Sequence, residues 1–202
     1  MYDLFLMFGS HGLEIFGAIT GLLYIWLEIE QKSSMWIVGF LSSLIYVFVY
    51  FHAKVYGYTA LYIYYMAVSI YGWYCWRYVK QNDNAAAGLQ TSRLRIPLAS
   101  ILIVITVSLF TGIAYILVQY TDSPVPYLDA LGFSLSIVAT WMLARKILEH
   151  WILWIFINFF SSALCFSLKL YPTAGLFIVY GTLSIIGWIK WKKNQSFNIE
   201  NQ

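Results

Sequence analysis

The sequence predicts an all-α integral membrane protein in which two similar three-helix units are joined by one further helix. Composition is the first reason: 61% of the 202 residues are hydrophobic and 10% are charged, whereas a soluble domain carries about one quarter charged residues. The second reason is a series of seven apolar runs, and the third is an internal repeat. Since a span needs about 20 residues, residues 1–202 are expected to form a single transmembrane domain.

The apolar runs predict the helices in chain order, because each run is bounded by charged or turn-forming residues. The second and sixth runs are short and take the middle position of each repeat, so these helices are expected to lean on their neighbours. Between the third and fourth runs, the hydrophilic stretch from Gln81 to Arg95 is expected to be a mobile loop. The seven transmembrane helices are expected at about 12–29, 36–51, 57–76, 96–118, 127–144, 151–168 and 172–191.

The internal repeat has an offset of 115 residues and needs no gap. Trp36 matches Trp151, Lys54 matches Lys169, and the string from Ile70 to Trp76 matches the string that starts at Ile185. Repeat one covers about 12–77, the linker helix about 96–118 and repeat two about 127–192. Duplication in so apolar a chain is typical of transporters, whose two halves move around a shared site near the membrane midplane.

The basic residues predict the orientation. Ten of the twelve fall on one side of the predicted spans, and only Lys54 and Lys169 fall on the other. By the positive-inside rule this places the N-terminus outside and the C-terminus in the cytoplasm. Because three helices and a linker separate equivalent positions, both repeats point the same way, which predicts a 3+1+3 parallel pseudo-repeat like that of the SWEET sugar facilitators.

A stripe of the sixth predicted helix holds the strongest candidate site. Trp151, Trp154 and Asn158 lie at i, i+3 and i+7, on one face of the helix. Trp151 is equally compatible with an aromatic belt at the membrane interface, and Asn158 with interhelical hydrogen bonding. Two indoles beside a buried amide would suit a flat heteroaromatic ring, and a positive charge on that ring would add a cation–π attraction. In repeat one the counterparts are Trp36, Gly39 and Ser43.

A second stripe runs along the third and seventh predicted helices. Tyrosine is so frequent here that packing is the simpler explanation for any one of them. Tyr65 and Tyr180 are stronger candidates, because both repeats keep the hydroxyl at the depth of a central site. The glycines at 72 and 187 are expected to allow close helix approach. The stripe contains Tyr62, Tyr65 and Ser69 in repeat one, matched by Phe177, Tyr180 and Ser184 in repeat two.

Acidic residues are few in this chain. Glu14 and Asp129 are equivalent in the repeat and lie near the outer ends of their helices, where they would attract a cation or simply cap a helix end. Glu28, at the inner end of the first helix, is expected to reach water or to pair with Lys32 at i+4.

Several classes of protein are excluded. The three histidines His11, His52 and His150 are isolated, and no metal-ligand spacing, nucleotide loop or nucleophile constellation occurs, so no cofactor, nucleic-acid partner or enzymatic activity is expected. A retinal protein is disfavoured because the seventh helix has no lysine in its middle. Both cysteines lie in apolar runs and are expected to be packing residues.

The motif Trp151-x-x-Trp154-x-x-x-Asn158, preceded by Arg145, Lys146 and Glu149, resembles the hallmark of the Pnu vitamin transporters. The resemblance extends over about 12–193. It implies a bacterial inner-membrane protein, often a homotrimer, that moves a cationic B-vitamin precursor by facilitated diffusion while a cytosolic kinase traps the substrate by phosphorylation.

The resemblance leaves two substrates open. Members called PnuC carry nicotinamide riboside and members called PnuT carry thiamine. In repeat one this chain has Ser42 and Ser43 where the nicotinamide riboside pattern has an asparagine, and Tyr62 where that pattern has a glutamine. The segment 141–146 is more similar to the thiamine branch. Both substrates are flat cationic heteroaromatics.

Two classes of function therefore compete. The leading hypothesis is a uniporter in which substrate passes Glu14 and Asp129, stacks on Trp151, Trp154 and Tyr180, and hydrogen-bonds Asn158. The alternative is a substrate-binding membrane subunit or an integral membrane enzyme without transport of its own. Such a subunit would need a polar surface for a partner, and the 80–95 segment is the only candidate.

Overall fold

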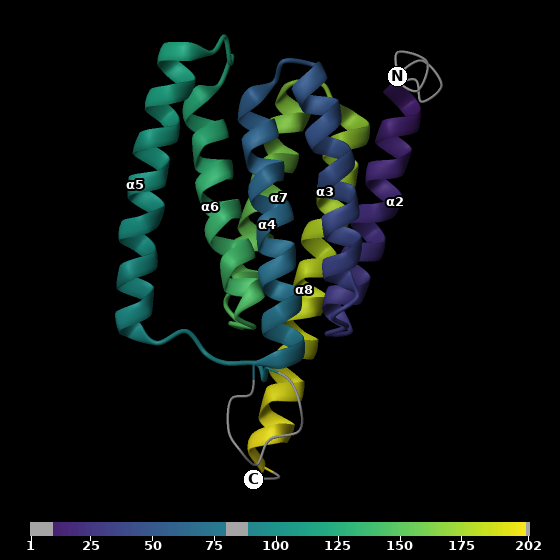
Figure 1. The fold of residues 1–202 in the computed structure, drawn as a ribbon, viewed down its shortest axis with the longest axis vertical. Coiled ribbons are helices and arrows are strands. Elements are labelled where there is room, and N and C mark those ends of the chain that lie inside the picture. The colour runs from purple at the N-terminus through teal and green to yellow at the C-terminus, as the bar shows by residue number, and fades with distance from the viewer. Residues whose placement is uncertain (1–9, 80–88, 201–202) are drawn as a thin grey trace.

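A computed structural model describes residues 10–79 and 89–200. Within these ranges the fold is all-helical, with helices that run roughly along one long axis and chain termini at opposite ends (Figure 1). The helices are α2 (Ser10–Ile29), α3 (Met35–His52), α4 (Tyr56–Tyr78), α5 (Ile96–Tyr120), α6 (Pro126–Ala144), α7 (His150–Ser167) and α8 (Tyr171–Glu200).

The element order agrees with the seven predicted helices, and the main difference is at the end of α8. That helix continues beyond the predicted end at about 191, to Glu200. Five helices of the described ranges are long and apolar enough to cross a membrane: α3, α5, α6, α7 and the part of α8 from Tyr171 to Gln195. In α4, eight tyrosines lower the mean hydropathy, whereas α2 contributes the shorter apolar stretch Ile15–Ile29.

The turns of the two repeats have the same backbone geometry. In the described part of the chain, four non-glycine residues adopt positive φ, and they form two pairs at the 115-residue offset: Gln31 (55°) with Lys146 (50°), and Lys54 (59°) with Lys169 (61°). After each of them the chain closes a six-residue hydrogen-bonded loop, such as Lys32 N–H to Leu27 O at 2.9 Å. This pattern is the Schellman helix ending, which satisfies carbonyl groups that the helix leaves unpaired.

Six of the helices pack in a closed ring. The neighbours in order are α2, α3, α4, α6, α7 and α8, and α8 packs against α2 again. Each packing pair in repeat one has its equivalent in repeat two, and the contacts between the repeats are α4 with α6 and α8 with α2. Helix α5 packs along α6 at the edge of the bundle (Figure 1).

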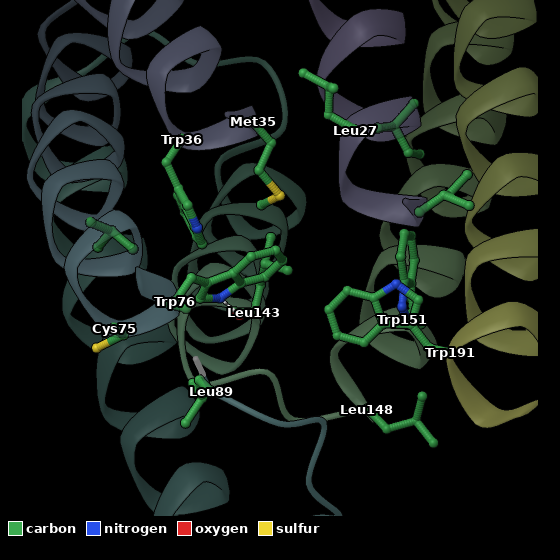
Figure 2. Close-up of a cluster of buried hydrophobic side chains, with 14 residues drawn as sticks. Leu27, Met35, Trp36, Cys75, Trp76, Leu89, Leu143, Leu148, Trp151 and Trp191 are labelled. Atoms are coloured by element: carbon green, nitrogen blue, oxygen red, sulfur yellow. Dashed lines mark hydrogen bonds between the residues drawn. The ribbon is translucent and has the colours of Figure 1, made fainter. Parts of the chain in front are cut away.

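The main core lies at one end of this ring, which we call the tryptophan end after Trp36, Trp76, Trp151 and Trp191 (Figure 2). All four side chains are at most 5% exposed. Trp36 meets Trp76 edge to face at 5.6 Å between ring centroids, and Trp151 meets Trp191 in the same way at 5.7 Å. Trp76 and Trp191 approach to 5.9 Å, which joins the two repeats.

Two indole hydrogen bonds also cross between the repeats at the tryptophan end. Trp76 on α4 donates to the Leu143 carbonyl of α6 at 3.2 Å, and Trp191 on α8 donates to the Glu28 carbonyl of α2 at 3.1 Å. The two donors, Trp76 and Trp191, are 115 residues apart, and so are the two acceptors, Glu28 and Leu143. Both bonds are buried, so each satisfies a donor that would otherwise be costly to remove from water.

Gly72 and Gly187 make room for this core. A Cβ atom on Gly72 would lie 2.4 Å from the ring of Trp36, and one on Gly187 would lie 2.4 Å from the ring of Trp151. The expected close approach is therefore confirmed, with the indole of the neighbouring helix lying against the glycine.

Residues 89–95, the described part of the segment expected to be a mobile loop, are bonded to the helix bundle. Ser92 forms two backbone hydrogen bonds with the α6–α7 turn. Its N–H donates to the Lys146 carbonyl at 3.0 Å, and its carbonyl accepts from the Leu148 N–H at 2.9 Å. The Glu149 carboxylate accepts a further bond from Leu94 N–H at 2.8 Å, and Leu89 is buried in the core. Residues 89–95 are therefore held on the bundle, while the rest of the expected loop lies outside the described residues.

We predict that Gly187→Ala destabilises the fold by about 1–3 kcal/mol, because the added methyl overlaps the Trp151 ring and a packed core accommodates extra volume poorly. Thermal unfolding in detergent micelles measures the effect. Gly132→Ala is the control, because a Cβ there would meet nothing within 4 Å. Equal melting temperatures for the two variants would contradict this account.

Candidate functional site

A cavity of about 880 Å³ lies inside the helix ring. Its lining extends from Pro172 and Thr173 at the start of α8 to Glu28 and Trp151 at the tryptophan end. Helices α2, α3, α4, α6, α7 and α8 all contribute, so both repeats share the cavity. Nine of the residues singled out from the sequence line it: Ser43, Tyr62, Tyr65, Ser69, Trp151, Trp154, Asn158, Tyr180 and Ser184.

Two other candidates lie elsewhere, and the side chain of a third is not described. Trp36 is 1% exposed and belongs to the core of the tryptophan end rather than to the cavity lining. Asp129 accepts a hydrogen bond from the Ser123 hydroxyl at 2.6 Å and does not line the cavity, so its local role is to fix the turn before α6. The side chain of Glu14 lies outside the described residues.

The stripe on α7 presents aromatic faces and polar atoms to the cavity. Trp151 is fully buried, which is incompatible with an anchor at the membrane interface. The indole N–H groups of Trp36, Trp151 and Trp154 are buried and have no hydrogen-bond partner among the described residues, and of these three residues Trp151 and Trp154 line the cavity. A buried donor without a partner is unusual in a folded protein, so the Trp154 N–H is available to an acceptor on a ligand.

Asn158 is 6% exposed and lines the cavity. Its amide donates a long hydrogen bond of 3.4 Å to the Ser184 hydroxyl, which in turn donates to the Tyr180 carbonyl at 2.8 Å. Within the described residues the carboxamide oxygen accepts no hydrogen bond. The Asn158 side chain is thus partly held by α8 and retains an acceptor for a ligand.

A group of tyrosine rings forms the opposite wall. Tyr62 stacks with Tyr50 at 5.4 Å, approaches Tyr46 at 4.9 Å and meets Tyr65 edge to face at 5.6 Å. Tyr46 and Tyr50 were not among the sequence candidates, although their i, i+4 spacing places them on one face of α3.

Small residues on α2 leave space for two further hydroxyls. A Cβ on Gly21 would lie 2.1 Å from the Tyr180 hydroxyl, and one on Gly17 would lie 2.1 Å from the Tyr46 hydroxyl. Both glycines line the cavity, so they widen it where the tyrosines enter.

A buried polar pair forms the floor of the cavity. Glu28 on α2 is 3% exposed, and its Oε1 lies 3.0 Å from Nε2 of His150, which is 0% exposed. The other ring nitrogen of His150 lies 2.7 Å from the Ile147 carbonyl. The expected pairing of Glu28 with Lys32 is therefore wrong, since Lys32 lies over the Trp26 ring, and His150 is not isolated. An ionisable residue inside an apolar helix is the sequence signal that should have marked Glu28.

The charges at the tryptophan end are mostly basic. They lie in the α2–α3 and α6–α7 turns, at the end of α4, around the start of α5 and on the last part of α8, which Figure 1 shows together at one end. Glu30, just beyond α2, accepts a hydrogen bond from Lys190 at 2.5 Å, and this partner lowers the pKa of Glu30. Both partners are largely solvent-exposed, so the pair adds little to stability.

Among the described residues, no three histidine, cysteine or acidic side chains are grouped so that they could hold a metal ion. The cavity is instead suited to an organic ligand, because aromatic faces surround a few polar atoms.

A cavity shared by two equivalent halves of an apolar helix ring is the arrangement of a multi-pass membrane transporter. The chain belongs to the nicotinamide mononucleotide transporter family, which it matches over residues 11–193. That match covers both repeats and the helix between them.

Named relatives are transporters as well. The chain is 26% identical over 201 residues to the nicotinamide riboside transporter PnuC of Escherichia coli K12, covering 89% of this chain and 84% of that protein. It is 28% identical over 193 residues to the riboflavin/roseoflavin transporter RibM of Streptomyces davaonensis, covering 94% and 89%. The crystal structure of the vitamin B3 transporter PnuC has the same fold, with a TM-score of 0.71 and 23% identity over 95% of this chain and 85% of that one.

We predict that Glu28→Ala lowers the stability of the protein by about 3 kcal/mol or more, because it leaves a buried imidazole without its partner. Unfolding in detergent, followed by near-UV circular dichroism, measures the loss. Glu30→Ala removes the exposed partner of Lys190 and should change the unfolding curve very little. A similar small effect for both variants would show that the Glu28 contact is not a stabilising interaction.

Proposed function

We propose that the protein takes up a flat, cationic heteroaromatic vitamin precursor, either nicotinamide riboside or thiamine, by facilitated diffusion. The observation that carries the proposal is the pairing, in one cavity, of the unpartnered Trp154 N–H and the free Asn158 carboxamide oxygen with indole and phenol faces. Such a site stacks on the face of a planar ring and hydrogen-bonds its polar edge.

In the proposed binding mode, the ligand ring lies against Trp151, Trp154 and Tyr180, and Asn158 contacts its polar edge. Tyr62 and Tyr65 close the opposite side. The hydroxyls of Ser43, Ser69 and Ser184 line the same cavity and are available to polar groups such as ribose hydroxyls. A positive charge on the ring would gain about 1–2 kcal/mol from the desolvated aromatic faces.

The relatives' names favour nicotinamide riboside as the first substrate to test, since PnuC proteins are named for it. The second relative is named for riboflavin and roseoflavin, which are also planar heteroaromatics. Thiamine remains an alternative because Ser42, Ser43 and Tyr62 depart from the nicotinamide riboside pattern.

The proposed architecture is a SWEET-like 3+1+3 arrangement with α5 as the linker helix. The proposed orientation in a bacterial inner membrane has the N-terminus outside and the tryptophan end in the cytoplasm. It is supported by the basic residues gathered at that end, whereas Lys54 and Lys169 lie in the turns at the opposite end. In this orientation Glu14 and Asp129 lie near the outer entrance and would attract a cation.

The driving force in this proposal needs no coupled ion. An inside-negative potential contributes about 2.3 kcal/mol per charge per 100 mV to the entry of a cation. Phosphorylation by a cytosolic kinase would then remove free substrate and sustain net uptake. A homotrimer is proposed as the assembly, with lipid around its outer surface.

We expect the purified protein in liposomes to perform counterflow of radiolabelled nicotinamide riboside with no ion gradient and no kinase. Empty liposomes are the control, and thiamine and riboflavin are tested as competitors. A requirement for a sodium or proton gradient would contradict facilitated diffusion. Binding without counterflow would instead favour a substrate-binding subunit.

Asn158→Leu should abolish measurable binding by isothermal titration calorimetry while the protein still folds, because it removes the free carboxamide and leaves a side chain of similar size. Thr182→Leu on α8 is the matched control, since its hydroxyl bonds to its own helix and the residue is exposed on the outer surface. Wild-type affinity in Asn158→Leu would remove this residue from the site.

A further inference from the structure

Equivalence by 115 residues breaks down chemically at two buried positions of the tryptophan end. Glu28 is equivalent to Leu143, and His150 is equivalent to Met35. Leu143 and Met35 are buried in the apolar core, with 1% and 0% exposure, whereas Glu28 and His150 form the buried polar pair. The two positions equivalent to the polar pair, each in the opposite repeat, are thus filled by apolar side chains, so packing alone does not require a polar pair.

The contacts of His150 fix how many protons the pair holds. A carbonyl oxygen can only accept, so Nδ1, at 2.7 Å from Ile147 O, carries a hydrogen. Nε2 and the Glu28 carboxyl oxygen, 3.0 Å apart, would repel each other as two lone pairs. One further proton therefore lies between them, on either the imidazole or the carboxyl group.

We propose that Glu28 and His150 form a proton-binding site that holds the tryptophan end of the cavity closed, and that opening of this end releases the shared proton to water. The proposal rests on the transport function proposed above, because it requires an opening of this end. Glu28 lies on α2 and His150 on α7, in opposite repeats. The pair thus lies at the same contact between the repeats as the hydrogen bonds from the Trp76 and Trp191 indoles to the Leu143 and Glu28 carbonyls.

The direction of the pH effect follows from proton counting. The closed pair holds one proton between Oε1 and Nε2. When the halves separate, water solvates both groups, and above about pH 7 an ordinary carboxylate and an ordinary imidazole hold none. Since the closed state binds more protons, rising pH favours opening, by up to about tenfold per pH unit.

Other titratable groups near the pair do not produce this effect. Tyr24 on α2 interacts with Glu28, whereas the packed faces of α3 and α8 present Met35, Trp36 and Trp191, which do not titrate. Lys146 lies in the turn before α7, and burial lowers its pKa to about 8. Its exposure on opening would restore a higher pKa and take up a proton, so its contribution has the opposite sign.

A native thiol reports on the opening. Cys75 on α4 is 1% exposed and belongs to the core of the tryptophan end. In a Cys165→Ser background, we would measure the rate of maleimide labelling of the detergent-solubilised protein between about pH 6.5 and 8.5. Dividing by the rate for urea-unfolded protein at the same pH removes the intrinsic reactivity of the thiolate.

The expected result is that the normalised labelling rate rises with pH, approaching tenfold per unit between about pH 7 and 8, and levels off toward pH 8.5, where proton uptake by the exposed Lys146 offsets the release. The matched variant is Glu28→Leu/His150→Met, which installs the apolar residues found at the equivalent positions, Leu143 and Met35. It should fold and give a normalised rate that is independent of pH. Glu28→Gln, which can donate a hydrogen bond to His150 but cannot share a proton, should also lose the pH dependence.

Several outcomes would overturn the proposal. A flat wild-type profile, a lack of Cys75 labelling, or a wild-type slope in Glu28→Leu/His150→Met would each do so, as would loss of the slope in Lys146→Met. Because no vitamin is present, the result is separate from that of the binding experiment. Failure to bind nicotinamide riboside or thiamine would contradict the proposed substrates but leave the labelling profile unchanged.

Discussion

The burial of four indoles at one end of the helix ring is the constraint on which the rest of this structure depends. Trp36 and Trp151 fit against glycines, and Trp76 and Trp191 satisfy their N–H groups on carbonyls of the opposite repeat. These contacts hold the two halves together at that end. The remaining length of the ring is then free to enclose a cavity.

The cavity lining and the core are both rich in aromatic residues, but these residues have different roles in the two places. In the core, aromatic side chains pack on each other, and two of the four indoles, Trp76 and Trp191, donate to carbonyls while those of Trp36 and Trp151 have no partner among the described residues. In the cavity, the tyrosine wall and Trp154 face an open volume, and the Trp154 N–H and the Asn158 oxygen keep unused hydrogen-bonding capacity. Unused hydrogen-bonding capacity is useful to a ligand only where, as at Trp154 and Asn158, the residue also lines an open volume.

The Glu28–His150 pair connects these two regions, because Glu28 lines the cavity and His150 lies in contact with the core tryptophans, 4.7 Å from Trp151 and 5.0 Å from Trp191 between ring centroids. A buried pair of this kind is costly to separate, unlike the exposed pair of Glu30 and Lys190. The apolar residues at the equivalent positions, Leu143 and Met35, show that the duplicated fold accommodates either kind of side chain there. The two repeats have therefore kept the same backbone while their chemistry has diverged.

Sequence by itself determined the helix order, the repeat and nine of the residues that line the cavity. Apolar runs of membrane length and a 115-residue offset are local or periodic properties, so they can be read from the chain, and helical spacing correctly put Trp151, Trp154 and Asn158 on one face. Only the tertiary structure decided which of these faces meets a cavity. Trp36 and Trp151 are equivalent in the repeat and each lies against a glycine, yet of the two only Trp151 lines the cavity, because the cavity boundary depends on how all six helices of the ring pack. The Glu28–His150 contact joins residues 122 positions apart, and such a pairing is set by how the two halves pack against each other, which no local pattern encodes.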